Sequence, residues 1–146
     1  MLGYSPSDIA ILYRYKPKKD DALFDSMLQR LQALGLPVYW ITESQQTKVS
    51  YSARTPGVRV ITTLSSLGLE FKAVLLLWVE QFEDCFAEDP DVRSLARRQL
   101  YVVMTRAQDE LHLVAGGNTA VVAALGKSEA VDMTSMAKQP VVLRPR

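Results

Sequence analysis

The sequence predicts an α/β fold, a three-layer sandwich in which helices cover both faces of a mainly parallel sheet. Two observations support this prediction. Short apolar runs of strand length alternate along the chain with segments whose apolar residues recur at helical spacing, which is the order of elements in β-α-β units. Some runs, such as residues 73–79, are apolar throughout, as expected for parallel strands buried on both faces.

The first forty residues contain two expected strands and one helix. Residues 8–13 are an apolar run rich in strand formers and predict a buried strand. The helix that follows is expected to be capped by Asp20 or Asp21 and to end at Gly35. Residues 38–42 predict the second strand. The apolar face of the helix is made by residues three or four apart: Phe24, Met27, Leu28, Leu31 and Leu34.

Two more strands are expected in the middle of the chain, at residues 58–62 and 73–79. The polar residues 43–57 before them predict a loop. The acidic residues 80–91 predict another loop, because they are mostly polar and include Pro90.

A long helix, a fifth strand and a short helix are expected next. The apolar stripe of the long helix consists of Val92, Ala96, Leu100, Val103 and Ala107. Residues 110–115 predict the strand, and Asn118 is expected to cap the short helix, which ends at Leu125. The final residues are weakly patterned, although residues 141–143 can add an edge strand.

Length and composition indicate one ordinary domain. We expect residues 1–146 to form it, with a core over about 8–125 and a tail over 126–146. The net charge is only +1, so a nucleic-acid partner would have to be bound by a local patch. Cys85 is the single cysteine, which excludes an internal disulfide and a zinc site, and we expect it to be a small buried apolar residue.

The sequence shows no targeting segment. No signal peptide precedes the first element, and no apolar stretch approaches the ~20 residues needed to cross a bilayer. We therefore predict a cytoplasmic protein without a membrane partner.

Residues 62–71, Thr-Thr-Leu-Ser-Ser-Leu-Gly-Leu-Glu-Phe, follow the third strand. Parallel α/β sheets carry their functional loops at the carboxyl ends of strands. Hydroxyls and backbone N–H groups there can contact nucleic-acid phosphates, which position a strand without reading its sequence. The alternative is a polar turn whose hydroxyls cap local backbone groups. The hydroxyls belong to Thr62, Thr63, Ser65 and Ser66.

Residues 97–107, Arg-Arg-Gln-Leu-Tyr-Val-Val-Met-Thr-Arg-Ala, end the long helix. The guanidinium of Arg106 is planar and permanently charged, and can spread its donors over several phosphate oxygens. The alternative is an arginine that simply benefits from the helix dipole at a carboxyl end.

In this order, the two segments resemble the late motifs of superfamily 1 DNA helicases of the UvrD/Rep/PcrA kind. Members of that family show Thr-x-His-x-x-Lys-Gly-Leu-Glu-Phe, then Arg-Arg-x-x-Tyr-Val-Ala-x-Thr-Arg-Ala. The resemblance covers about residues 8–117 and implies the second, carboxyl-terminal RecA-like motor domain of a P-loop NTPase-like protein. The short segment between the second and third strands implies the compact form, without an inserted helical domain.

The sequence lacks the phosphate loop Gly-x-x-x-x-Gly-Lys-Ser/Thr and an Asp-Glu strand end for Mg²⁺. The resemblance therefore implies a fragment that does not hydrolyse ATP alone. ATP would be its cofactor, with Mg²⁺ held by the first RecA-like domain of the same parent protein. Its other partner would be single-stranded DNA.

The resemblance also implies roles for individual residues. Arg106 would be the arginine finger beside the γ-phosphate. Glu70 would reach the ribose of the nucleotide, and Gly68 would keep the turn compact. The hydroxyl residues Thr62, Thr63, Ser65 and Ser66 would contact one DNA strand. Arg14, which follows the first strand, would face DNA or the interdomain cleft.

The resemblance assigns supporting roles to the rest of the second segment. Arg97 and Arg98 would form ion pairs at the domain interface, although Ala96 replaces the acidic residue that commonly precedes them. Tyr101 is expected to pack in the core with its hydroxyl at an interface. Thr105 is expected to cap the helix or orient Arg106.

Two positions depart from the family pattern. Leu64 replaces the family histidine and Leu67 replaces the lysine, and leucine cannot make their polar contacts to DNA and the nucleotide side. Three functions therefore remain open: a helicase or translocase motor domain, a non-hydrolysing interaction module with the same fold, and an unrelated doubly wound domain such as a signalling receiver. The receiver would need an acidic cluster after the first strand, where residues 13–16 are basic and aromatic instead.

Overall fold

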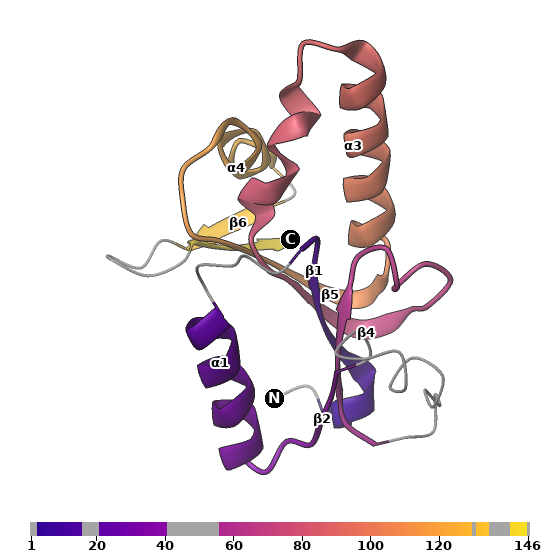
Figure 1. Ribbon diagram of the computed structural model, residues 1–146, viewed down its shortest axis with the longest axis vertical. Helices are drawn as coiled ribbons and strands as arrows, with labels where there is room; N and C mark the ends of the chain where they lie inside the picture. Colours follow the sequence, from indigo (N-terminus) through magenta and orange to yellow (C-terminus); the bar gives the residue numbers. More distant parts are fainter. Residues whose placement is uncertain (1–2, 16–20, 41–55, 130, 135–140, 146) are drawn as a thin grey trace.

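The computed structural model describes residues 3–15, 21–40, 56–129, 131–134 and 141–145, and the predicted alternation of strands and helices is confirmed (Figure 1). The predicted loop at 43–57 and the cap at Asp20 lie largely outside these residues. The elements are η1 (Pro6–Asp8), β1 (Ile9–Tyr13), α1 (Asp21–Ala33), β2 (Val38–Trp40), β3 (Val58–Thr62), β4 (Phe71–Leu76), η3 (Val79–Phe86), α3 (Pro90–Met104), β5 (Ala107–Ala115), α4 (Ala120–Gly126), β6 (Val131–Thr134) and β7 (Val141–Pro145).

The strands form one seven-stranded sheet in the order β2-β3-β1-β4-β5-β7-β6. The first five strands are parallel, and β7 pairs antiparallel with both β5 and β6. The predicted α/β class is therefore confirmed, and the parallel order 2-3-1-4-5 is consistent with a RecA-like domain. The strand predicted at residues 141–143 exists but is not at the edge, because β6 pairs with its outer side.

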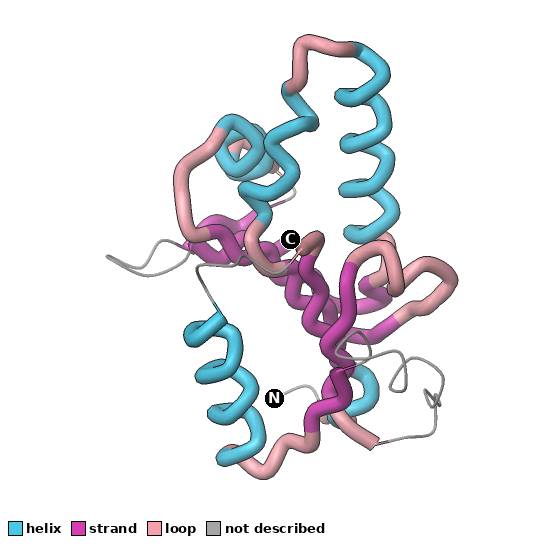
Figure 2. Tube along the Cα trace, viewed as in Figure 1, coloured by secondary structure: helices cyan, strands magenta, loops and turns pink. Residues whose placement is uncertain are grey.

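Helices cover both faces of the sheet (Figure 2). The alternation of side chains along β1 shows the reason: Ile11 and Tyr13 pack with Phe24 of α1, whereas Ala10 and Leu12 face the opposite layer. That second layer is made by η3, α3 and α4, which lie together above the sheet (Figure 1). The three-layer arrangement follows from strands that are apolar on both faces.

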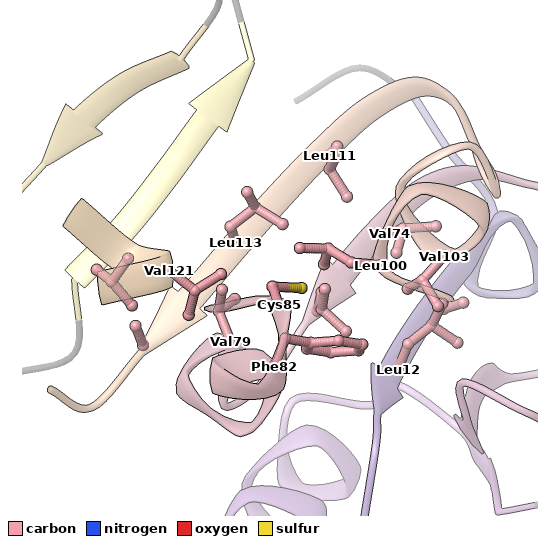
Figure 3. Packing of buried hydrophobic residues seen from close by; sticks show 14 of the residues in the cluster. Leu12, Val74, Val79, Phe82, Cys85, Leu100, Val103, Leu111, Leu113 and Val121 are labelled. Atoms are coloured by element: carbon pink, nitrogen blue, oxygen red, sulfur yellow. The ribbon is translucent and has the colours of Figure 1, made fainter. Parts of the chain in front are cut away.

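The acidic segment after β4 is a core element, and the prediction of a loop there was wrong. Residues Val79–Phe86 form η3, which consists of two short 3₁₀ helices joined by a kink at Phe82, and Val79, Phe82 and Cys85 are buried in it. Their spacing of three matches the three residues per turn of a 3₁₀ helix, so one row of side chains faces the sheet. Figure 3 shows these three side chains among residues of β1, α3 and β5. Burial raises the pKa of the Cys85 thiol.

The chain turns into η3 at Trp78, which adopts a left-handed backbone with φ of 52°. The predicted strand 73–79 therefore ends earlier, at Leu76. The indole ring of Trp78 lies edge-on to Tyr13 at 6.2 Å and stacks on Phe24 at 5.9 Å between ring centroids. These ring contacts offset the cost of a non-glycine residue in this conformation, about 1–3 kcal/mol.

The helix α3 begins one residue after Asp89, whose carboxylate accepts hydrogen bonds from Asp91 N at 2.8 Å and Val92 N at 3.4 Å. Its buried stripe is shorter than predicted. Ala96, Leu100 and Val103 are buried, but Val92 is exposed and Ala107 already belongs to β5. Tyr101 was predicted to pack in the core and is instead 69% exposed, because it lies on the outward face of the helix.

The short helix α4 is capped by a distant side chain. Thr119, rather than Asn118, occupies the N-cap position, and its hydroxyl makes no cap hydrogen bond. The carboxylate of Glu83 in η3 accepts hydrogen bonds from Ala120 N at 3.1 Å and Val121 N at 3.3 Å. An anion at this position satisfies unpaired N–H groups and interacts favourably with the helix dipole.

Replacing Glu83 with alanine is expected to lower the free energy of unfolding by about 1 kcal/mol, the typical effect of losing a helix cap. Glu88→Ala is the matched control, because Glu88 is exposed in the same acidic segment. Urea unfolding followed by circular dichroism measures both changes. Equal effects of the two substitutions would contradict a capping role for Glu83.

Candidate functional site

The segment that joins β3 to β4 runs beside α3 and forms one wall of a groove. We call this the α3 groove, and its volume is about 450 Å³. Two exposed leucines, Leu64 and Leu67, lie on it. Leu64 is 73% exposed and Leu67 is 56% exposed. Other side chains of the groove include Tyr15, Thr63, Arg98 and Val102.

Residues 62–66 form a tight turn held by its own hydroxyls. Thr62 Oγ1 accepts from Ser65 N at 3.2 Å and lies 3.0 Å from Ser65 Oγ. Ser66 is fully buried and donates its hydroxyl to Thr63 O at 2.6 Å. Thr62 and Ser65 are half-buried, so theirs are the hydroxyls of the set with the best access to solvent. The local capping inferred from the residue types is present, and phosphate contact stays a prediction.

Gly68 completes this turn with a φ of 81°. A Cβ atom at this position would meet no atom within 4 Å. The requirement for glycine is therefore conformational, because side chains disfavour the left-handed region even where space is open.

The side chain of Arg106 joins the end of α3 to the segment before β4. Its Nε donates to Val102 O at 3.0 Å and its Nη1 donates to Leu69 O at 3.2 Å. Its Nη2 lies 3.4 Å from Thr105 Oγ1, and that hydroxyl donates to Val102 O at 2.8 Å. These contacts orient the guanidinium and leave two of its five N–H groups without a partner among the described residues.

Glu70 is exposed and lies close to Arg106, because the two residues immediately precede the neighbouring strands β4 and β5. Phe71, which follows Glu70, pairs with Ala107, which follows Arg106, and Phe71 N donates to Arg106 O at 2.8 Å. Gln108 Nε2 donates to Glu70 Oε2 at 3.1 Å. The role of Gln108 was not predictable, because its partner Glu70 is 38 residues away in the sequence.

The predicted site residues fall into two groups, one at the carboxyl ends of the parallel strands and the other at their amino ends. At the carboxyl ends, Arg14 follows β1 and Thr62 is the last residue of β3. At the amino ends, Glu70 precedes β4 and Arg106 precedes β5. The six residues of β4 separate these ends by about 20 Å. The segment between β3 and β4 connects the two groups, because it begins after Thr62 and ends at Glu70.

Arg14 is held by η3. Its guanidinium forms a bidentate pair with Asp84, at 2.7 and 2.6 Å, and donates to Gln81 O at 2.7 Å. The guanidinium carbon lies 4.8 Å from the centroid of the Phe82 ring. Hydrogen bonding to Asp84 raises the pKa of Arg14 above its ordinary value. The sequence did not predict Asp84, because the pair spans 70 residues. Contact between Arg14 and DNA stays a prediction.

Removing either member of the half-buried Arg14–Asp84 pair is expected to lower the free energy of unfolding by about 1–3 kcal/mol. The measurement is a double-mutant cycle with Arg14→Ala, Asp84→Ala and the double variant in urea. The double variant should lose less than the sum of the two single changes. Strictly additive losses would show that the pair contributes no coupling energy.

Arg97 and Arg98 have no carboxylate partner among the described residues. Arg97 Nε donates to Cys85 O at 2.9 Å, and Arg98 Nη2 donates to Ser94 Oγ at 3.4 Å. Both of these hydrogen-bond acceptors are neutral oxygens. Pairing across a domain interface stays a prediction.

The chain resembles one solved helicase fragment. The crystal structure of the C-terminal domain of a possible DNA helicase from Lactobacillus plantarum WCFS1 superposes with a TM-score of 0.50 and 27% sequence identity. The match covers 80% of this chain and 61% of that one, so this chain spans less than two thirds of the matched structure. Fold and likeness together define a helicase-like C-terminal α/β domain.

Other comparisons add no closer assignment. No protein-family model matches the chain, and no curated protein does. Within the part of the chain that the structure describes, every helix is too short or too polar to cross a membrane.

Proposed function

We propose that this chain is the C-terminal motor domain of an ATP-dependent DNA helicase or translocase, and that Arg106 is its arginine finger. The orientation of Arg106 is the observation that carries the proposal. Backbone oxygens at Val102 and Leu69 fix the side chain, yet two N–H groups remain for an anion. A charge fixed before the reaction needs no reorganisation as the transition state forms.

Glu70 and Gly68 would complete this chain's part of the ATP site. The carboxylate of Glu70 is exposed and can accept hydrogen bonds from ribose hydroxyls, while Gln108 limits its rotation. These residues and Arg106 fit the ribose and γ-phosphate of ATP in chemical character. Mg²⁺ would be held by the first motor domain of the parent protein, so the isolated chain is not expected to hydrolyse ATP.

Single-stranded DNA would bind at the opposite edge of the sheet. Thr62 and Ser65 offer hydroxyls and backbone N–H groups at the carboxyl end of β3, which suit phosphate oxygens. Thr63 and Ser66 would shape the turn from within. Arg14 would join this surface only by sharing Asp84 or leaving it.

The arrangement suggests how the two sites would communicate. The segment between β3 and β4 runs from the proposed DNA contact at Thr62 to the proposed nucleotide contact at Glu70. Arg106 is bonded to that segment at Leu69 O. ATP-driven closure of the two motor domains would therefore move the turn at residues 62–66 together with the arginine finger and advance the strand.

ATP hydrolysis by the complete protein, measured with and without single-stranded DNA, tests this function. The motor proposal predicts hydrolysis that DNA stimulates, with Thr62→Val reducing the stimulation more than the basal rate. A protein that binds no ATP and ignores DNA would overturn the proposal.

A non-hydrolysing interaction module is the second candidate, and the exposure of Leu64 and Leu67 favours it. Two large apolar side chains on one groove are more typical of a protein contact than of a phosphate contact. The same assay separates the functions, because a module of this kind would show neither ATP binding nor DNA-stimulated hydrolysis.

A further inference from the structure

The outward side of α3 carries a basic surface to which the proposed motor function assigns no contact with ATP or DNA. Three arginines and one tyrosine line a shallow hollow of about 420 Å³ there, with Pro90 and Ser94. We call it the arginine face, made by Arg93, Arg97, Arg98 and Tyr101. Residues 93, 97 and 101 follow one another at intervals of four, which places them about 6 Å apart along one side of the helix.

The charges of the arginine face are not neutralised. Arg93 Nη1 donates to Ala87 O at 2.8 Å, Arg97 Nε donates to Cys85 O at 2.9 Å, and Arg98 reaches only Ser94 Oγ. Across the described residues, none of the three guanidinium groups forms an ion pair with a carboxylate. Arg14 differs, because Asp84 neutralises it.

Two of these guanidinium groups are already positioned. Backbone carbonyls hold Arg93 and Arg97, and the guanidinium of Arg97 also lies 5.7 Å from the centroid of the Phe86 ring. Side chains that are ordered before binding lose less conformational entropy when a ligand arrives. The nearby acidic residues do not line the hollow: Asp89 caps α3, and Asp91 lies in its first turn.

Tyr101 adds an aromatic surface to these charges. Its side chain is 69% exposed, one helical turn beyond Arg97. Positive charge beside an exposed aromatic ring is the combination that binds single-stranded nucleic acid, since the cations contact phosphates while a base stacks on the ring. Duplex DNA offers the ring no unstacked base.

We infer that the arginine face is a second contact site for single-stranded nucleic acid, separate from the turn at residues 62–66. It uses none of the residues assigned above to ATP or to DNA, so this inference and the motor function can fail independently. Because the net charge of the chain is only +1, electrostatic attraction to nucleic-acid phosphates has to come from local patches such as this one.

The test is fluorescence anisotropy of a labelled oligothymidylate, about 20 nucleotides long, titrated with the chain at several salt concentrations. The variants are Arg97→Ala/Arg98→Ala and Tyr101→Ala, with Lys127→Ala as a control because Lys127 is an exposed cation beyond the arginine face. Circular dichroism checks that each variant is folded, and Arg98→Ala alone replaces the double variant if loss of the Arg97 contact unfolds it.

The two kinds of substitution should act differently. Removing two phosphate contacts should weaken binding and reduce the slope of log K against log salt by about 1.4, or by about 0.7 for Arg98→Ala alone. Tyr101→Ala should reduce affinity about fivefold to a hundredfold while leaving the slope unchanged. Lys127→Ala should leave both quantities as in the wild type.

Three results would overturn the inference. The first is that the arginine variants bind the oligonucleotide like the wild type. The second is equal binding of a duplex with no effect of Tyr101→Ala, which would indicate a general cation surface. The third is that a polyglutamate peptide, but not the oligonucleotide, binds through these arginines, which would identify an acidic protein surface as the partner.

Discussion

Replacing Arg106 with alanine in the complete protein is expected to lower DNA-stimulated ATP hydrolysis by about 10³–10⁵-fold, the effect of removing an arginine finger. The physical reason is the loss of a positioned, permanent positive charge beside the phosphoryl group where negative charge develops. Steady-state hydrolysis at saturating single-stranded DNA measures the change. The affinity for ATP should change far less than the rate.

Arg106 also has a structural role, so the experiment needs controls. The alanine variant loses the bonds to Val102 O and Leu69 O and is expected to be somewhat less stable. Arg106→Lys keeps the charge but loses the planar fork, and a finger should still lose most of its effect in that variant. Arg30→Ala removes an exposed arginine at the end of α1 and should leave hydrolysis unchanged. Full activity of a folded Arg106→Ala protein would refute the assignment.

The apolar runs predicted the parallel strands, because a strand that is buried on both faces needs apolar side chains along its whole length. The run at residues 58–61 includes one charged residue, Arg59, whose residue type predicts exposure although it is almost fully buried in β3. Its guanidinium bonds to Gly57 O and lies 5.6 Å from the centroid of the Tyr39 ring. The antiparallel addition of β7 between β5 and β6 depends on pairing that no local pattern records.

The site residues that belong to the two sequence motifs were predictable. Their contact partners from distant parts of the chain were not. The two motifs predicted Gly68, Glu70 and Arg106, and the structure places the last two immediately before the neighbouring strands β4 and β5. Asp84 was not predictable, because its pair with Arg14 depends on η3 folding back over β1. Burial of Ser66 was equally hidden, since composition cannot tell which hydroxyl of a polar turn faces inward.

The acidic segment η3 shows most clearly why local composition misleads. Three of its eight residues, Val79–Phe86, are Glu or Asp, yet each of these has a structural position at the surface of the core. Glu80 accepts from Gly116 N, and Glu83 caps α4. The composition of the element is therefore polar, although one row of its side chains is apolar. A repeat of three residues is easily missed when only the periods of α-helices and strands are sought.

Replacing Phe82 in this row with alanine is accordingly expected to lower the free energy of unfolding by about 3–5 kcal/mol. Its ring is completely buried between β1, α3 and β5 (Figure 3) and also lies beneath the Arg14 guanidinium. A loss of this size is a large fraction of the about 5–15 kcal/mol that stabilises a typical domain. Thermal and urea unfolding of the chain measure it.

Phe86→Ala is the matched control, because it makes the same chemical change four residues later in the same element. Phe86 is 46% exposed and contacts Arg97 through its ring face, so its loss should cost about 1 kcal/mol or less. A large difference between the two variants would establish η3 as part of the core, because only a buried ring leaves a cavity when it is removed. Similar small losses would mean that the segment packs as a surface loop, and the positions of Arg14 and Asp84 would then lose their support.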